Sequence, residues 1–162
     1  TGLPNRASLA NHLVRELARS ETDRHVFAVL YLEVANHRDI PDNQAEEAIA
    51  ALAKAVTTAV DDGTYLSRYS TSAFVLIVTN PAHHKYEDMY QRLRDLPRET
   101  DGGVTLELRA GQSVFPNSGR NSRMLMKKAM ETSELRKLGL ASLKEEVKSA
   151  DYFEARSALP ET

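Results

Sequence analysis

The sequence reads YLSRYSTSAFVLIV at residues 65–78, and this stretch decides the fold. Tyr65–Tyr69 has the composition of a β-strand, and Phe74–Val78 is a second strand that is almost wholly apolar. Only small polar residues separate them, so we expect a tight hairpin. A strand this apolar belongs in the middle of a sheet, which holds the turn at Ser70–Ala73 rigidly at the sheet's end. That turn is well placed for chemistry, yet it contains no glycine, carboxylate or base.

Outward from the hairpin, the other elements follow from hydrophobic spacing and from breaking residues. A buried central strand is predicted at 26–32, where every position is apolar, and a half-buried strand at 104–110, where apolar and polar residues alternate. Helices are predicted where apolar residues recur at helical spacing and end near breakers such as Gly63, Pro97 and Gly139. Their expected ranges are 5–20, 43–60, 86–96, 122–139 and 140–150.

From residue 26 to residue 115 the expected order is strand, helix, strand, strand, helix, strand. This order is typical of ferredoxin-like folds, so the sequence predicts an α+β domain with a βαββαβ core and a central antiparallel sheet flanked by helices. Right-handed crossovers place the first strand between the third and the fourth, with the second at the edge. Glu33, at the end of the first strand, is therefore expected beside the Ser70–Ala73 turn.

The composition is that of an ordinary globular domain. The chain has 162 residues, is 41% hydrophobic and carries a net charge of −2, which favours a single core and provides no basic field for binding nucleic acid. The absence of cysteine excludes disulfides, thiolate catalysis and zinc-thiolate sites, and it permits a reducing compartment. The longest apolar run is too short to span a bilayer, so we expect a cytoplasmic domain without membrane contact of its own.

Several motifs together resemble those of a known family. The chain opens on TGLPNR, and RYSTSAF at 68–74 stands where that family has Arg-Tyr-Gly-Gly-Asp-Glu-Phe. AGQS at 110–113 and KKA at 127–129 are similar to two later family segments. On these residues the chain resembles a GGDEF domain of the diguanylate cyclase family, which condenses two GTP molecules into cyclic di-GMP. The resemblance implies a GGDEF-like domain at 1–139, followed at 140–162 by a helix and tail that are a candidate linker to a further domain.

When the family's functional positions are carried over one by one, the residues that bind phosphate and metal at the hairpin are missing. The two glycines that admit the triphosphate are Ser70 and Thr71 here, and their side chains crowd that approach. The acidic pair that follows, one member of which is a metal ligand in the family, is replaced by Ser72 and Ala73. Phe74 is retained. The resemblance therefore implies a degenerate site that is not enzymatic.

The other functional positions of the family are also mostly altered. Its first metal carboxylate aligns with Glu33, and Arg38 keeps the charge of a family lysine. Its guanine-recognising Asn falls at Pro41, and the partner Asp falls near Glu46. The inhibitory Arg-x-x-Asp motif that binds product would lie at 61–64, which reads DDGT instead.

Glu33, Arg38 and Arg68 remain as candidate nucleotide or metal contacts. One carboxylate does not recruit Mg²⁺ in the family's manner, so the sequence predicts no metal and no cofactor. The structural alternative for Glu33 is that it is solvated or paired with Arg38 or Arg68. Strand alternation predicts that Arg68 is partly buried with a partner.

Three functions are compatible with the resemblance. The favoured one is a catalytically inactive regulatory or interaction module in bacterial cyclic di-GMP signalling. Its partners would be a sensor or an EAL phosphodiesterase-type domain in the same longer chain, and other signalling proteins; the abrupt start at Thr1 fits such a chain. The second is a domain that binds GTP or cyclic di-GMP without turnover and controls a neighbouring domain. The third, an active cyclase with a rebuilt site, is disfavoured by the missing carboxylates.

Two predicted helices are candidate interaction surfaces for an inactive module. The last helix carries Leu143 and Val147 on one face, and the helix before it carries Met124, Met126 and Met130. These side chains belong either to the core or to an interface with a partner. We favour the core for the last helix, because a helix of this length is expected to pack its apolar face against the rest of the domain.

Overall fold

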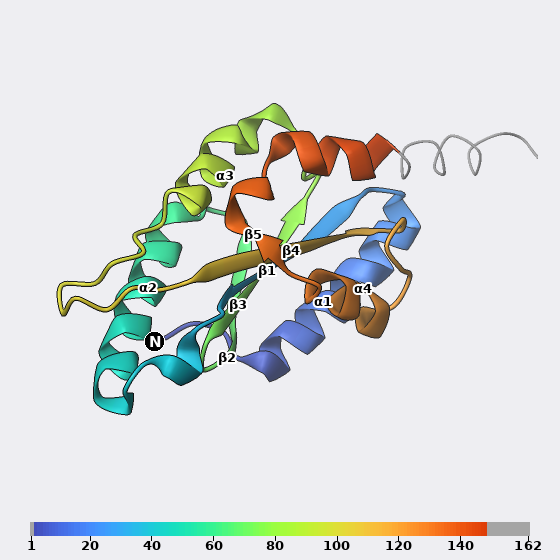
Figure 1. The fold of residues 1–162 in the computed structure, drawn as a ribbon. Helices are drawn as coiled ribbons and strands as arrows, with labels where there is room; N and C mark the ends of the chain where they lie inside the picture. Colours follow the sequence, from blue (N-terminus) through green and yellow to red (C-terminus); the bar gives the residue numbers. More distant parts are fainter. Residues whose placement is uncertain (1, 149–162) are drawn as a thin grey trace, which may run out of the picture.

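The computed structural model describes residues 2–148, which form an antiparallel sheet covered by helices on both faces (Figure 1). The α-helices are α1 (Arg6–Asp23), α2 (Asp42–Ala59), α3 (Glu87–Arg94) and α4 (Ser122–Ala129), with a further helix at 140–148. The strands are β1 (Phe27–Val34), β2 (Tyr65–Ser70), β3 (Ala73–Thr79), β4 (Leu108–Phe115) and β5 (Ser133–Glu134). In this part of the chain no helix is both long and apolar enough to cross a bilayer.

The sheet confirms the predicted α+β, ferredoxin-like core. Its strand order is β2-β3-β1-β4-β5, so β1 lies between β3 and β4 and β2 lies outside β3. The hairpin stretch forms β2 and β3 as expected, with Leu66 opposite Leu76. Glu33 lies opposite Ala73 across the β1–β3 pair, which confirms that the end of β1 and the hairpin turn are neighbours. The sequence analysis missed β5, which pairs with the outer edge of β4.

The central strands are buried on both faces because each face carries its own helical layer. Alternate residues of β1, such as Leu30, join a core with α2, α3 and the helix at 140–148. The residues between them, such as Val29, join a second core under α1 and α4. This two-sided burial explains why β1 and β3 are apolar at nearly every position instead of alternating.

The first helix begins where the sequence predicts. The side chain of Asn5 accepts a hydrogen bond from the Ser8 backbone amide at 2.9 Å, which caps the first turn of α1. On the inner face of α1, Leu9 and Leu13 are buried in the second core, and Leu17 packs against them partly buried. The second helix begins at Asp42, slightly before its predicted start, and Pro41 is its N-cap residue, with a φ of −56° and a ψ of 138°.

Two predicted boundaries were wrong. The strand predicted at 104–110 lies at Leu108–Phe115 instead, because β1 supplies partners only from residue 108 onward. Residue 105 makes only an isolated bridge to Glu99, although the neighbouring Leu106 is buried in the core. The helix predicted at 122–139 ends at Ala129, and the chain then forms β5 and a short 3-10 helix at Leu135–Lys137. Ser133–Glu134, which helical spacing had assigned to the helix, instead pairs with the open edge of β4.

The helix at 140–148 belongs to the core, as we favoured. Leu143 is fully buried in the cluster that α2 and α3 also enter, and Val147 packs partly buried against it. The methionines of α4 and of its C-cap residue divide differently: Met126 is partly buried, whereas Met124 and the C-cap Met130 are 51% and 43% exposed. Of the two candidate surfaces, only the α4 surface therefore presents large apolar side chains to solvent in the described residues.

Gly111 allows β4 and the end of α4 to approach each other closely. A Cβ atom at this position would lie 1.9 Å from the Ala129 carbonyl oxygen, a backbone atom that cannot move aside cheaply. We therefore expect Gly111→Ala to lower the free energy of unfolding by about 1–3 kcal/mol in urea denaturation. Gly102→Ala is the control, because the nearest atom to its added Cβ would be 3.9 Å away. Equal stability of the two variants would contradict this close contact.

Candidate functional site

The hairpin turn is held at the end of the sheet, beside the end of β1. Thr71 and Ser72 connect β2 to β3, and the register shifts between Arg68 and Ser70. The Ser72 amide donates to the Ser70 hydroxyl at 3.3 Å, and the Ser72 carbonyl accepts from the Val34 amide at 2.9 Å. The turn is therefore bonded both to itself and to the neighbouring strand.

The five motif positions 70–74 differ in exposure along the turn. Ser70 and Thr71 are exposed and Ser72 is half-buried, whereas Ala73 and Phe74 are fully buried. The methyl group of Ala73 thus belongs to the packed core under α1 and α4. Hydroxyl and methyl groups are the only side-chain functions that positions 70–73 bring to this edge.

The remaining carboxylate, Glu33, is already engaged. Its Oε1 accepts a hydrogen bond from the Thr132 hydroxyl at 2.9 Å. The Thr132 hydroxyl in turn accepts from Arg109 Nε at 3.4 Å, and the Thr132 carbonyl accepts from Arg109 Nη2 at 3.2 Å. Arg109 lies opposite Glu33 across the β1–β4 pair. The sequence analysis missed Thr132 and Arg109, although the predicted topology could have placed Arg109 near Glu33.

The expected pairing of Glu33 with Arg38 or Arg68 does not occur among the described residues. Arg38 lies in a short 3-10 helix at His37–Asp39 and is exposed. The loop that carries it is held by Asn36, whose amide donates to the Thr105 carbonyl at 2.8 Å and whose side-chain oxygen accepts from the Glu107 amide at 2.8 Å. Thus no hydrogen bond or ion pair joins the three candidate contact residues to one another within residues 2–148.

Arg68 braces the hairpin turn. Its Nε donates to the Ser70 carbonyl at 2.9 Å, and its Nη2 donates to the Thr71 carbonyl at 2.7 Å. The guanidinium carbon lies 5.5 Å from the centre of the Phe74 ring, within cation–π distance. The expectation that Arg68 is partly buried with a partner is confirmed, and its partners are turn carbonyls and a ring.

We expect Arg68→Ala to lower the free energy of unfolding by about 1–2 kcal/mol, because two turn carbonyls lose their donor. If Arg68 is only a structural brace, GTP will not change this difference. The measurement is urea denaturation with and without GTP, and Arg123→Ala, which removes an exposed arginine of α4, is the matched control. A loss of stability seen only when GTP is present would identify Arg68 as a nucleotide contact instead.

The segment at 61–64 also has an internal partner. Asp61 forms an ion pair with Arg92 of α3, and Arg92 Nε donates to the Ala59 carbonyl at 2.9 Å. The side chain of Asp61 and the guanidinium of Arg92 are about two-fifths exposed, so the pair lies at the surface. These contacts join the end of α2 to α3.

The residues at the hairpin edge do not fit a divalent metal. Mg²⁺ is held by carboxylates and other oxygens in near-octahedral geometry, and of residue 33 and positions 70–73 only Glu33 carries a carboxylate, which Thr132 already bonds. Within residues 2–148, His, Asp and Glu side chains do not gather in threes that could hold a metal ion. Positions 70–73 can present hydroxyl groups and backbone dipoles to a ligand, but no negative charge.

Comparison with known proteins agrees with this fold. A family model described as "Diguanylate cyclase, GGDEF domain" matches residues 1–138. The signaling protein YkoW of Bacillus subtilis (strain 168) is 24% identical over 139 residues, which are 80% of this chain and 17% of that protein. The chain therefore spans less than one fifth of this curated relative.

Two solved structures illustrate the likeness of the backbone. The GGDEF domain of FimX from Pseudomonas aeruginosa superposes with a TM-score of 0.69 at 17% identity, over 86% of this chain and 93% of that chain. The active GGEEF domain of a diguanylate cyclase from Vibrio cholerae superposes with a TM-score of 0.64 at 18% identity, over 80% of this chain and 87% of that chain. At these identities the likeness shows only that the fold is shared. It does not show whether the chemistry is shared.

Proposed function

The chain belongs to the GGDEF domain family, and from this premise we propose that it is a catalytically inactive member that serves as a regulatory or interaction module in cyclic di-GMP signalling. The observation that carries the proposal is the turn between β2 and β3. Ser70, Thr71, Ser72 and Ala73 occupy it, and Glu33 beside it is bonded to Thr132. The chain has the family's fold but lacks the family's metal-binding and phosphate-binding residues in this turn. This combination supports a role that depends on the folded surface and not on catalysis.

The chemistry explains why these residues do not support turnover. Joining two GTP molecules is a transfer to phosphorus, in which bound cations neutralise the charge that develops on the phosphate oxygens. The cations need carboxylate ligands, and of residue 33 and positions 70–73 only Glu33 offers one. Ser70 and Thr71 also add side chains where the triphosphate would approach the backbone.

The N-terminal segment offers a physical route for regulation. The Arg68 amide, at the start of the hairpin bulge, donates to the Pro4 carbonyl at 2.8 Å. The guanidinium of Arg6 lies 3.9 Å from the centre of the Tyr69 ring. Two contacts therefore attach residues 4–6 to β2, so a displacement of this segment would be passed to the sheet. In our proposal a sensor or an EAL-type domain of a longer cytoplasmic chain, or another signalling protein, uses this coupling.

Calorimetric titration separates the proposed function from its alternative, a domain that binds a nucleotide without turnover. GTP with Mg²⁺, and separately cyclic di-GMP, would be titrated into the protein up to about 1 mM, where binding free energies are only about −4 kcal/mol. We expect no saturable heat for either ligand. Saturable binding of either one would replace the proposed module with the nucleotide-binding alternative.

A further inference from the structure

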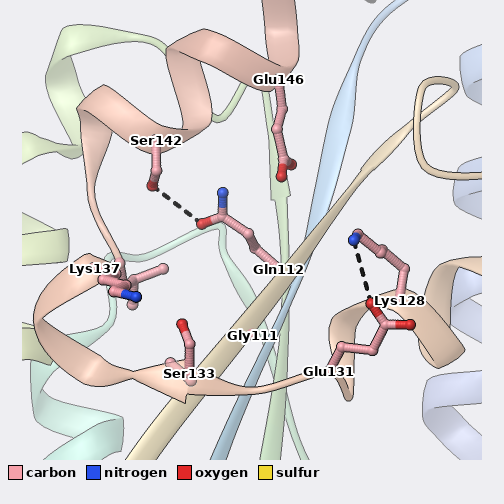
Figure 2. A pocket seen from close by; sticks show the side chains of 10 residues that line it. Gly111, Gln112, Lys128, Glu131, Ser133, Lys137, Ser142 and Glu146 are labelled. Carbon is pink, nitrogen blue, oxygen red and sulfur yellow. Dashed lines mark hydrogen bonds and ion pairs between the residues drawn. The ribbon is translucent and has the colours of Figure 1, made fainter.

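The solvent side of α4 carries a basic stripe. Residues 120–130 contain four basic side chains and no acidic one. Arg123 and Lys127, one helical turn apart, are both exposed, and neither forms an ion pair with another described residue. The neighbouring Lys128 is paired with Glu131 at 3.2 Å (Figure 2). The stripe therefore offers two positive charges that the described part of the chain does not pair.

Two exposed methionines flank this stripe. Met124 precedes Lys127 by three residues and Met130 follows it by three, so both lie beside it on the helix surface. Together with Val14, they are the large apolar side chains that the described residues expose. Methionine is flexible and adapts to irregular partner surfaces, and both Met and Arg are enriched at protein interfaces. We call Arg123, Met124, Lys127 and Met130 the α4 face.

The opposite charge is gathered around the start of α2. Residues 39–53 contain no basic side chain and four carboxylates, which we call the α2 face: Asp39, Asp42, Glu46 and Glu47. All four are exposed, and none forms an ion pair with another described residue. Asp42 and Glu46 are four residues apart, a spacing at which like charges repel each other on a helix. A basic partner would relieve this repulsion.

An apolar groove of about 400 Å³ continues from the α2 face, between α2 and α3. Ala51 and Ala55 follow Glu47 at intervals of four residues and line the groove, and Leu96 lines it from the end of α3. The charged residues of its lining are of both signs, so they do not reverse the acidic character of the α2 face. Its small side chains leave room for long flexible ones such as methionine.

A single copy of the chain cannot bring the two faces together. The buried residues of α2 belong to the core on one face of the sheet, and those of α4 belong to the core on the other. Figure 1 shows the two helices on opposite sides of the sheet. Two copies can meet through these faces, because each copy exposes both. A contact between two α4 faces would place like charges opposite each other, so the charge pattern favours a head-to-tail contact.

We propose that the chain associates with a second copy of itself through the α4 face of one copy and the α2 face of the next. The basic stripe meets the carboxylates of the second copy, and the two methionines enter its groove. Exposed charge pairs contribute little individually and are screened by salt, so the contact is weak and salt-dependent. The hairpin contributes nothing to either face, so the proposal can fail while the proposed function stands.

Sedimentation equilibrium tests the association directly. The protein would be measured from about 10 μM to about 1 mM, a range that covers weak contacts. Raising NaCl from about 20 mM to about 500 mM shortens the Debye length from about 20 Å to about 4 Å. We expect the average mass to rise with protein concentration in low salt and to stay near that of one chain in high salt. The mass of one chain in low salt, or a rise that salt does not weaken, would overturn the proposal.

Charge reversals with a matched control test the α4 face. Arg123→Glu with Lys127→Glu should weaken association about tenfold or more, because like charges then face each other. Lys144→Glu with Lys148→Glu changes the net charge equally at exposed positions of the helix at 140–148 and should associate as the original protein does. Thermal melts should show that both variants remain folded, since all four positions are exposed. Equal association of the two variants would contradict a contact through the α4 face.

A second double variant tests the partner face. Glu46→Lys with Glu47→Lys reverses the centre of the α2 face and should by itself associate as weakly as the reversed α4 variant. When these two variants are mixed in equal amounts, association should return, because the reversed stripe of one meets the reversed α2 face of the other. A reversed α2 variant that associates like the original protein, or a mixture that stays at the mass of one chain, would show that the head-to-tail contact is wrong.

Discussion

No cyclic di-GMP should form when the protein is incubated with GTP and Mg²⁺ or Mn²⁺, even at high protein concentration. The family's chemistry needs several metal ligands, but of residue 33 and positions 70–73 only Glu33 carries a carboxylate, and Thr132 already bonds it. Losing a bound cation at a phosphoryl-transfer centre removes about 3 kcal/mol or more of transition-state stabilisation, which corresponds to at least about a hundredfold in rate. Chromatography of the reaction mixture against a cyclic di-GMP standard provides the measurement.

Two controls make this result informative. An active diguanylate cyclase assayed in parallel shows that the conditions support turnover, and heat-denatured protein provides the background. Product above that background would mean that the site is rebuilt from groups other than carboxylates at positions 72 and 73. In that case the proposed function is wrong.

Replacing Leu143 should have the largest effect on stability. Its side chain is fully buried in the core that α2 and α3 share, so Leu143→Ala removes packed methyl groups and leaves a cavity. We expect the free energy of unfolding to fall by about 2–5 kcal/mol. Leu143→Asp, which also buries a charge without a partner, should leave little folded protein at 25 °C. Urea denaturation followed by circular dichroism measures both variants.

Lys144→Ala is the matched control, since Lys144 is the exposed neighbour of Leu143 in the same helix. It should change the free energy of unfolding by no more than about 0.5 kcal/mol. A melting temperature for Leu143→Asp close to that of the original protein would mean that the helix at 140–148 is not part of the core in solution. The exposed methionines of α4 would then no longer be the better candidate for a contact surface.

Local sequence determined the centre of this fold. Neighbouring residues alone specify the apolar runs of β1 and β3 and the short polar turn between β2 and β3. The burial of β1 and β3 on both faces follows from their apolar composition. Topological rules then placed Glu33 beside the turn, because right-handed crossovers allow few arrangements of these strands. The absence of glycines and carboxylates at 70–73 is likewise evident from the sequence itself.

The tertiary structure decided what depends on partners distant in the chain. The start of β4 is set by where β1 ends. The strand β5 forms because a segment with helical spacing pairs with the open edge of β4. Thr132 meets Glu33 across 99 positions of sequence, and periodicity carries no information about such a contact. A cavity lined by Gln112 of β4 and Ser142 of the helix at 140–148 is of the same kind, because residues distant in the chain enclose it jointly. Periodicity reports which face of an element is buried, whereas the identity of the partner across that face is settled only when the whole chain packs.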